Sequence, residues 1–279
     1  MSGRLAGRVA VVTGATGVLM RPMVEEMVRQ GAAVAILNRT AQKGQEMADA
    51  LRAQGGQVLA IPVDVLNRQQ MVDARTQIME QWGRCDILIN GAGGNRADAI
   101  TSETVFSPHS EKPEGAQSFF DLSLDGFQEV FNINFIGSVL ASQVFGERLA
   151  ASARGVVINI SSMSALRPMT RVPAYSAAKA AIENFTKWLA VYLAEVGVRV
   201  NAIAPGFFLT EQNRRLLTNE DGSWTPRTQA ILQHTPAKRL GTPDDLLGTL
   251  LWLLDDRASG FVTGITVPVD GGFLAYAGV

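Results

Sequence analysis

Residues 9–17, with the sequence VAVVTGATG, join an apolar strand to a glycine-containing turn. The β-branched run from Val9 to Thr13 predicts a buried strand, and a helix is expected over 18–30. Glycines let a backbone approach a pyrophosphate closely, and the helix N-terminus offers free N–H groups and a positive dipole end. The turn therefore predicts a dinucleotide site, although a turn without any ligand could have the same sequence. The expected contacts are Gly14, Thr16, Gly17, Val18 and Leu19.

The same alternation of strand and helix continues along the chain. Further strands are predicted at 33–37, 58–62, 87–89, 156–160, 198–203 and 265–269, and helices at 41–54, 68–81, 124–151, 174–195 and 244–254. This alternation predicts an α/β fold of the Rossmann type, a doubly wound parallel sheet of about seven strands with helices on both faces. We expect a single domain over residues 1–279. Two long loops, about 91–122 and 206–242, leave the carboxyl ends of strands and are expected to bind substrate.

The composition excludes several classes of protein. With 279 residues, 47% of them hydrophobic and 18% charged, the chain can form a packed core. Its 25 basic and 26 acidic residues leave no positive excess, so nucleic-acid binding is not expected. The single cysteine, Cys85, excludes an intrachain disulfide, and the presence of only two histidines argues against a zinc site. Without a secretory signal or a run of 18 apolar residues, we expect no membrane span and a cytoplasmic location.

Asn38 and Arg39 end the second predicted strand, where sheets of this kind contact the adenosine ribose. An acidic side chain there would accept hydrogen bonds from the ribose and favour NAD, whereas an arginine favours the 2′-phosphate of NADP. Asn38 does not repel a phosphate and Arg39 could attract one. The pair therefore favours NADP over NAD, with a solvated Arg39 and an NAD-using enzyme as the open alternative.

Ser162, Tyr175 and Lys179 form the candidate catalytic group. Tyr175 and Lys179 lie four residues apart on a predicted helix and therefore share a face. A nearby cation stabilises a phenolate and lowers the phenol pKa from about 10, so such a tyrosine can act as a general acid or base. Ser162 can hydrogen-bond a reacting carbonyl or hydroxyl. The group suits hydride transfer at a carbon–oxygen bond. Each motif alone also occurs by chance, and their combination with the nucleotide turn favours catalysis.

Together these motifs resemble those of the classical short-chain dehydrogenase/reductase family over residues 5–274. The matching positions are Thr13-Gly14 with Gly17, Asp64, Asn90-Gly91-Ala92-Gly93, Asn134, Ser162, Tyr175 with Lys179, and Pro205-Gly206 with Thr210. The resemblance implies a nicotinamide-dependent oxidoreductase in which Tyr175 is the general acid or base. Lys179 would lower the pKa of Tyr175 and hold the ribose, and Ser162 would position the substrate oxygen.

The resemblance also assigns roles to residues outside this group. Asn134 would hold a water of a proton relay. Asp64 and Val65 would contact the adenine. The cleft for the rest of the cofactor would be lined by Asn90, Gly91, Ala92, Pro205, Gly206, Phe208 and Thr210. A homodimer or homotetramer is implied too, with Trp188 and Tyr192 in the core or at the interface.

Two features depart from the common family pattern. Val18 and Met20 stand where later glycines of the turn are usual, and Asn38 replaces the acid expected of NAD-using members. The stretches 17–19, 89–95, 119–122, 204–214, 219–223 and 268–273 are similar to the D-mannonate oxidoreductase (fructuronate reductase) branch of the family. That similarity implies the interconversion of D-mannonate and D-fructuronate.

A sugar acid needs a cation for its carboxylate and polar groups for its hydroxyls. The candidate substrate-binding residues are Asn95, Ser164, Arg167, Gln212, Asn213 and Arg214, with Arg96 and Arg171 as further candidates. The run 212–215 is the most suggestive of a site for the substrate, because it directly follows the segment predicted to hold the nicotinamide. The alternative is that this run is a solvated lid helix without a substrate contact. Two other functions remain open. One is a reductase of another polyol, keto-gluconate or ketone, and the other is a cofactor-binding sensor without turnover.

Overall fold

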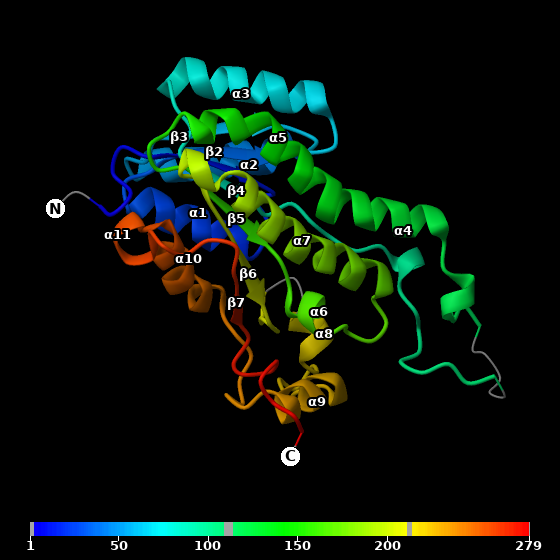
Figure 1. Cartoon of the computed structure of the whole chain (residues 1–279). Helices are drawn as coiled ribbons and strands as arrows, with labels where there is room; N and C mark the ends of the chain where they lie inside the picture. Colours follow the sequence, from blue (N-terminus) through cyan, green and yellow to red (C-terminus); the bar gives the residue numbers. More distant parts are fainter. Residues whose placement is uncertain (1–2, 109–113, 211–213, 279) are drawn as a thin grey trace.

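A seven-stranded parallel sheet forms the centre of the computed structural model, which describes residues 3–108, 114–210 and 214–278 (Figure 1). The strands are β1 (Val9–Thr13), β2 (Ala33–Asn38), β3 (Val58–Pro62), β4 (Ile87–Asn90), β5 (Val156–Ile160), β6 (Arg199–Pro205) and β7 (Thr266–Val269). Their order is β3-β2-β1-β4-β5-β6-β7, and every neighbouring pair is parallel. This order confirms the predicted Rossmann-type, doubly wound sheet in one domain.

Helices cover both faces of the sheet, as the apolar strands predict. The main helices are α1 (Met20–Arg29), α2 (Ala41–Ala53), α3 (Arg68–Trp82), α4 (Leu124–Phe131), α5 (Gly137–Ala150), α7 (Pro173–Tyr192) and α10 (Leu247–Leu254). Successive side chains of β1 point to opposite faces. Ala10 and Val12 pack with α1, α2 and α10, whereas Val9 and Val11 pack with α3, α5 and α7. In the described residues, no helix combines the length and apolarity needed to cross a membrane.

Several elements differ from the predicted ones. The helix expected over 124–151 is interrupted by a π-helical turn, Asn132–Ile136, between α4 and α5. The region 206–242 is not only a loop, because it contains the helices α8 (Arg214–Leu217) and α9 (Pro226–His234). Two further short helices, α6 (Met163–Leu166) and α11 (Asp256–Ser259), were not predicted. All of these short elements depend on tertiary contacts more than on local periodicity.

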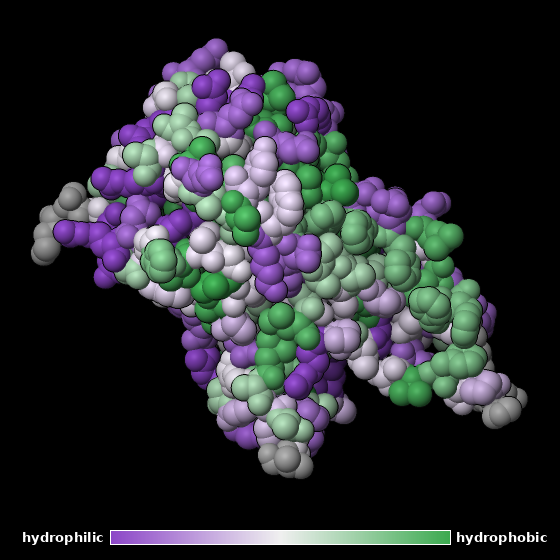
Figure 2. Space-filling view, viewed as in Figure 1, coloured by the Kyte–Doolittle hydropathy of each residue, from purple (hydrophilic) through white to green (hydrophobic). Residues whose placement is uncertain are grey.

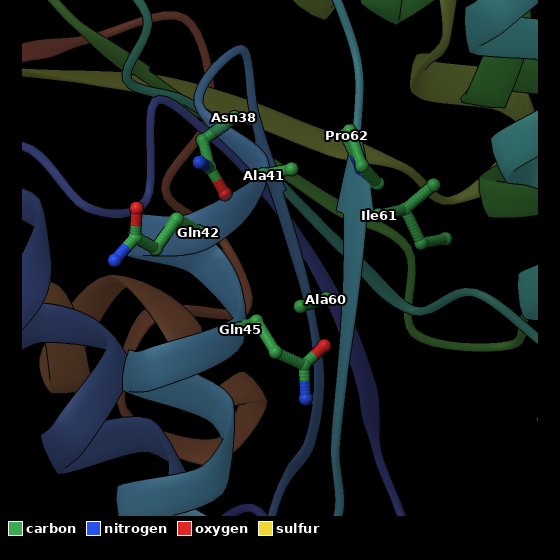
Figure 3. Close-up of a pocket in the computed structure, with 7 residues that line it drawn as sticks. All are labelled: Asn38, Ala41, Gln42, Gln45, Ala60, Ile61 and Pro62. Carbon is green, nitrogen blue, oxygen red and sulfur yellow. The ribbon is translucent and has the colours of Figure 1, made fainter.

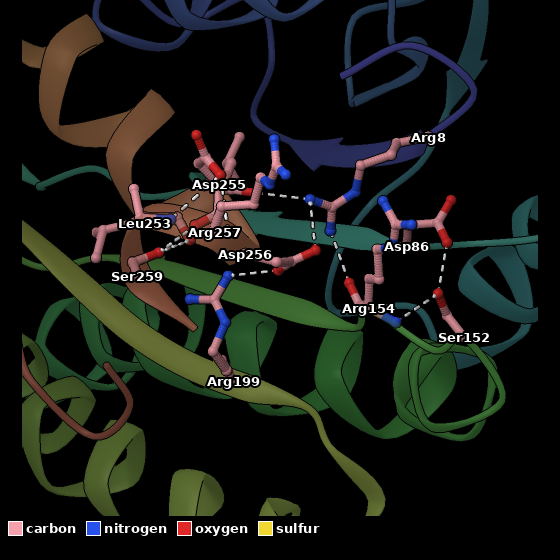
Figure 4. Close-up of polar contacts among 12 residues, drawn as sticks. Arg8, Asp86, Ser152, Arg154, Arg199, Leu253, Asp255, Asp256, Arg257 and Ser259 are labelled. Carbon is pink, nitrogen blue, oxygen red and sulfur yellow. Dashed lines mark hydrogen bonds and ion pairs between the residues drawn. The ribbon is translucent and has the colours of Figure 1, made fainter. Parts of the chain in front are cut away.

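A network of charged groups holds the amino ends of the strands, opposite the edge discussed below (Figure 4). The buried Arg8 donates to the Leu254 carbonyl from Nη1 and to the Arg154 carbonyl from Nη2, both at 2.6 Å. Asp256 forms ion pairs with Arg8 at 3.7 Å and with Arg199 at 2.9 Å. Burial lowers the pKa of Arg8, and Asp256 partly offsets this effect. The network ties α11 to β1 and β6 and leaves the carboxyl ends of the strands open for a site.

Candidate active site

The predicted glycine turn lies where the strand order reverses, between β1 and β4, which is where open α/β sheets bind ligands. Gly14 has a left-handed backbone (φ 64°), and a Cβ there would lie only 2.7 Å from the Cα of Ala92. The Thr13 hydroxyl accepts hydrogen bonds from the N–H groups of Gly91 at 3.1 Å and Ala92 at 3.3 Å. The turns after β1 and β4 therefore touch, and only glycine fits at position 14.

The turn between β1 and α1 offers free donors. The N–H of Gly17 donates to Gly14, and that of Met20 donates to Gly17. The N–H groups of Thr16, Val18 and Leu19 have no acceptor among the residues that the structure describes. Leu19 caps α1 without a side-chain hydrogen bond. Free N–H groups at the start of a ten-residue helix fit a pyrophosphate, so the turn suits a dinucleotide.

Met20 shows how the departure from the family's glycine pattern is accommodated. Its side chain is buried, and a Cβ at Gly91 would lie 2.6 Å from the Met20 sulfur. Met20 therefore packs against the turn after β4. Because α1 begins at Met20 and not at the expected Val18, the main chain of Val18 and Leu19 stays in the turn.

The residues predicted for the adenosine lie near a pocket of about 300 Å³ between α2 and the end of β3 (Figure 3). The pocket is lined by Asn38, Ala41, Gln42, Gln45, Ala60, Ile61 and Pro62, with no carboxylate among them. Asn38 is buried, its amide N–H donates to the Thr40 carbonyl, and its Oδ1 has no partner. Arg39 is exposed.

Asp64 and Val65 follow β3 at the same edge. The Asp64 carboxylate accepts from the Leu66 N–H at 3.0 Å, which closes a local turn and leaves its second oxygen for a ligand. The Val65 side chain faces the core, because a Cβ at Gly137 would lie 2.8 Å from its Cγ2. Any contact of Val65 with adenine is therefore left to its main chain.

Asn90 does not point into the predicted cleft. Its amide donates to Asn159 Oδ1 at 2.8 Å and to Ser142 Oγ at 3.2 Å, inside the fold. A polar side chain at a buried strand end finds partners on the neighbouring strand and helix before it finds solvent. Only the main chain of Asn90 can therefore line the cleft, and for these main-chain atoms the contact stays a prediction.

Asn134 lies in the π-helical turn between α4 and α5 and is fully buried. Its amide donates to the carbonyls of Gly94 at 2.7 Å and Val130 at 2.8 Å, and its Oδ1 accepts from the Gly94 N–H at 3.3 Å. Single π-helical turns are frequent at functional sites. This turn directs Asn134 at the glycine-rich segment after β4.

The predicted catalytic side chains come together beside Gly93. A Cβ at Gly93 would lie 2.6 Å from Asn134 Oδ1 and 3.5 Å from Lys179 Nζ. Lys179 Nζ lies 5.6 Å from the centre of the Tyr175 ring and donates to the Ile160 carbonyl at 2.8 Å. The Ser162 hydroxyl lies close enough to Tyr175 to lower the pKa of its phenol. The end of β5 and the first turns of α7 thus hold two hydroxyls and one amine in a single group.

The ionisation of this group differs from the expectation. Burial raises the pKa of Tyr175, and the hydrogen bond from Ser162 only partly offsets that rise. Burial also lowers the pKa of Lys179 to about 8. The predicted depression of the Tyr175 pKa by Lys179 is not found, because the amine is directed at the Ile160 carbonyl and the phenol is desolvated.

Glu183 is a buried carboxylate that the sequence analysis did not single out. It accepts hydrogen bonds from the hydroxyls of Ser161 and Thr266 and so joins α7 to the end of β5 and to β7. Its spacing of four residues from Lys179 was the available signal, since it places both on one face of α7. The described ranges contain no group of three or more His, Cys, Asp or Glu side chains that could hold a metal ion.

The segment after β6 was predicted to hold the nicotinamide. Pro205 is buried at the end of β6, and a Cβ at Gly206 would lie 2.6 Å from the Cα of Asp270. Phe208 is directed inward, because a Cβ at Gly241 would lie 2.8 Å from its ring. Its ring packs against the core, and a contact of this residue with a cofactor stays a prediction. Thr210 is partly buried at the end of this segment.

The structure separates the predicted substrate-binding residues. Ser164 is buried, and its hydroxyl donates to Ser162 Oγ at 3.0 Å, so it positions Ser162. Arg167 donates to the main-chain carbonyls of Leu274 and Tyr276 near the C-terminus. Asn95 accepts from the Arg96 N–H at 2.9 Å and is exposed. Arg214 begins α8 and is exposed, whereas Gln212 and Asn213 lie outside the described residues.

Among known protein families, the sequence model of the short chain dehydrogenases matches residues 8–221 of this chain. The chain is 58% identical to UxuB of Bacillus subtilis (strain 168), described as an uncharacterised oxidoreductase, over 99% of this chain and 98% of that protein. A Haemophilus crystal structure, described as a candidate D-mannonate oxidoreductase with bound NAD, is 43% identical (TM-score 0.95, covering 99% and 98% of the two chains). A candidate gluconate dehydrogenase from Agrobacterium tumefaciens is 28% identical (TM-score 0.84, covering 98% of each chain).

Proposed function

The chain belongs to the short-chain dehydrogenase family and acts as an oxidoreductase on CH–OH groups, and we propose that it interconverts D-mannonate and D-fructuronate. The observation that supports this substrate is the likeness to the Haemophilus structure, which covers 99% of this chain at 43% identity. The similarity of 119–122 and 204–214 to that branch supports it, because these loops flank the candidate catalytic group.

We propose that Tyr175 donates a proton to the substrate oxygen in reduction and takes it back in oxidation. When bound, a nicotinamide cofactor supplies or accepts the hydride. The residues that would hold it are the turn 14–19, Asp64, the main chain of 90–92 and the segment 205–210. The Ser162 hydroxyl lies close enough to Tyr175 to lower the pKa of its phenol, so we propose that a substrate oxygen beside them is hydrogen-bonded by both.

Lys179 and Asn134 complete the proposed mechanism. Below about pH 8 the Lys179 amine is charged and lies 5.6 Å from the centre of the Tyr175 ring. It does not lower the pKa of the resting phenol, and we propose that it stabilises the negative charge that forms on Tyr175 as the proton leaves. Asn134 lies on the same side of Gly93 as Lys179, and its amide donates to the Gly94 carbonyl at 2.7 Å. We propose that it holds a water that returns the proton to Tyr175 through Lys179.

We propose NADP(H) as the preferred cofactor. Arg39 is exposed and makes no ion pair with any described residue, and Lys43 is exposed in the first turn of α2. That turn contains no acidic residue, and Thr40 does not cap it with its side chain. The positive end of α2, two cations and a pocket without a carboxylate together favour a 2′-phosphate.

One coupled assay tests the substrate and the cofactor. With NADPH, the purified protein should reduce D-fructuronate much faster than 5-keto-D-gluconate. With D-fructuronate, kcat/KM should be higher for NADPH than for NADH. Arg39→Asp should lower the preference for NADPH by roughly 10- to 100-fold, because it replaces an attractive charge by a repulsive one. Turnover of 5-keto-D-gluconate alone would overturn the substrate proposal, and an unchanged cofactor ratio in the variant would overturn the role of Arg39.

We also propose a homo-oligomer, either a dimer or a tetramer, joined through α4 and α7. Trp188, Val191 and Tyr192 are 57%, 79% and 69% exposed on α7, and the rings of Trp188 and Tyr192 stack at 5.0 Å. Figure 2 shows hydrophobic side chains gathered over the side of the molecule that carries these two helices. Monomers seldom expose an apolar area of this kind unless a partner covers it.

Light scattering after size exclusion is expected to give twice or four times the chain mass of 29.9 kDa. Val191→Glu should shift the protein to a smaller species, because it places a charge in the proposed interface. Val105→Glu is the matched control, since Val105 is 77% exposed in the loop 91–122 and its substitution should leave the mass unchanged. A monomeric wild-type protein at micromolar concentration contradicts the proposal.

A further inference from the structure

The carboxylate of a sugar acid needs a cationic partner, because an unpaired charge is costly to bring into a partly closed site. Most basic residues near the candidate catalytic group already have partners. Arg96 forms ion pairs with Asp98 and Glu129. Arg239 forms one with Asp245 at 2.6 Å. The guanidinium of Arg167 is taken up by two main-chain carbonyls near the C-terminus.

Arg171 differs from these residues in its backbone and in its contacts. It lies between α6 and α7, and its backbone is left-handed (φ 73°). Only Lys238 shares this conformation among the non-glycine residues that the structure describes. Such a backbone is unfavourable for arginine and persists only where surrounding contacts enforce it, commonly at functional sites.

The enforcing contacts come from the loop after β4. Arg171 Nε donates to the Thr101 carbonyl at 2.8 Å, and the Thr101 N–H donates to the Arg171 carbonyl at 2.9 Å. This reciprocal pair fixes the base of the guanidinium through one nitrogen. The two terminal nitrogens have no partner in the described ranges, and no carboxylate pairs with the side chain. A fixed, unpaired guanidinium is prepared for two parallel hydrogen bonds to a carboxylate.

The position of Arg171 matches the proposed chemistry. It lies four residues before Tyr175, whose ring packs with Ala99 and Ala174. Thr101 is two residues after Ala99, and Arg171 is three residues before Ala174. The pair Thr101–Arg171 therefore borders the wall against which the reacting phenol packs. A sugar acid whose reacting carbon lies at Tyr175 would extend its carboxylate toward one of these borders.

We infer that Arg171 binds the carboxylate of the substrate and so selects sugar acids over neutral sugars. The inference rests on the proposed function and goes further by naming the residue that sets the substrate class. The left-handed backbone and the Thr101 pair position the guanidinium, and Ser162, Tyr175 and Lys179 act on the reacting carbon several bonds away.

The test compares a charged and a neutral ketose in the intact enzyme with NADPH. Arg171→Gln should lower kcat/KM for D-fructuronate by about 10- to 100-fold, the loss expected for a charge-assisted pair, mainly through KM. Its kcat/KM for D-fructose should change by less than about two-fold. For D-fructuronate, kcat/KM of Arg171→Lys should lie between those of the wild type and Arg171→Gln, because lysine keeps the charge and lacks the planar, two-pronged guanidinium. Arg148→Gln is the matched control, because Arg148 is exposed in the last turn of α5, and it should leave the ratio of kcat/KM for the two ketoses unchanged.

Other outcomes overturn the inference or the proposed function separately. An equal loss on both ketoses in Arg171→Gln means a structural role and overturns the inference. Arg171→Gly removes the guanidinium and suits the left-handed backbone. If this variant keeps the wild-type ratio of kcat/KM for D-fructuronate to kcat/KM for D-fructose, the inference is also overturned. If the wild type does not reduce D-fructuronate, the proposed function fails. D-mannonate is then tested as a competitive inhibitor of the best ketone substrate, and inhibition that is equally strong in Arg171→Gln overturns the inference.

Discussion

Tyr175→Phe is expected to lose roughly 10²- to 10⁴-fold in kcat, because it removes the group that we assign to exchange a proton directly with the substrate oxygen. The phenol is desolvated, and Ser162 is close enough to lower its pKa, so both hydroxyls are near the place that we propose for the substrate oxygen. The ring itself packs with Ala99 and Ala174, and phenylalanine keeps those contacts. The fold and the nucleotide turn should therefore survive the substitution. The measurement is NADPH oxidation with D-fructuronate, together with NADPH binding by fluorescence.

Tyr192→Phe is the matched control for this substitution. Tyr192 is on the same helix, 69% exposed and far along it from the candidate catalytic group, so its hydroxyl should not affect kcat. If Tyr175→Phe keeps more than about a tenth of the wild-type kcat, Tyr175 is not the proton donor. If the wild type binds NADPH but turns over no ketone, the alternative of a cofactor-binding sensor gains support.

The strands were the most predictable part of the fold. Val9–Thr13, Val58–Pro62 and Val156–Ile160 have the predicted bounds, because short β-branched runs are typical of strands in a parallel sheet. The π-helical turn at Asn132–Ile136 could not be predicted in the same way. Its residues continue the apolar pattern of α4 and α5, and one extra residue per turn leaves no mark on composition.

For the site, position along the chain was easier to predict than side-chain direction. Residues at strand ends reach the same edge of a parallel sheet, so the close approach of Gly14 to Gly91 and Ala92 follows from the topology. The inward directions of Asn90 and Phe208 depend on Asn159 and Gly241, which lie far away in the sequence. No local pattern contains that information.

The pKa of Tyr175 likewise depends on surroundings that the sequence does not predict. Spacing correctly places a lysine on the same face of α7, but the sign of the pKa shift depends on burial and on the carbonyl of Ile160. A raised phenol pKa and a lowered amine pKa leave Tyr175 protonated and Lys179 close to half charged near pH 8. This state suits an acid that gives a proton to a carbonyl, and it makes Lys179 the group whose charge changes in the working range of pH.

Lys179→Met is expected to lower kcat on the order of 10²-fold, since it removes the cation that favours the Tyr175 phenolate. It should also change how stability depends on pH. In the unfolded chain the lysine has its ordinary pKa of 10.5, whereas in the fold its pKa is about 8. Between these values the unfolded state binds more protons, so the unfolding free energy of the wild type rises with pH, by about 3 kcal/mol in total.

Urea unfolding of both proteins at pH 7, 8, 9 and 10 measures this effect. The quantity compared is the difference in unfolding free energy between the wild type and Lys179→Met. The difference should be constant below about pH 8, where the buried amine is charged, and should then move in favour of the wild type as the amine loses its proton. Lys187→Met is the control, because Lys187 is exposed two turns further along α7 and its loss should leave kcat unchanged. A difference that does not depend on pH would show that Lys179 keeps its charge throughout. Charge loss at Lys179 could then not explain any fall in reductive activity above pH 8.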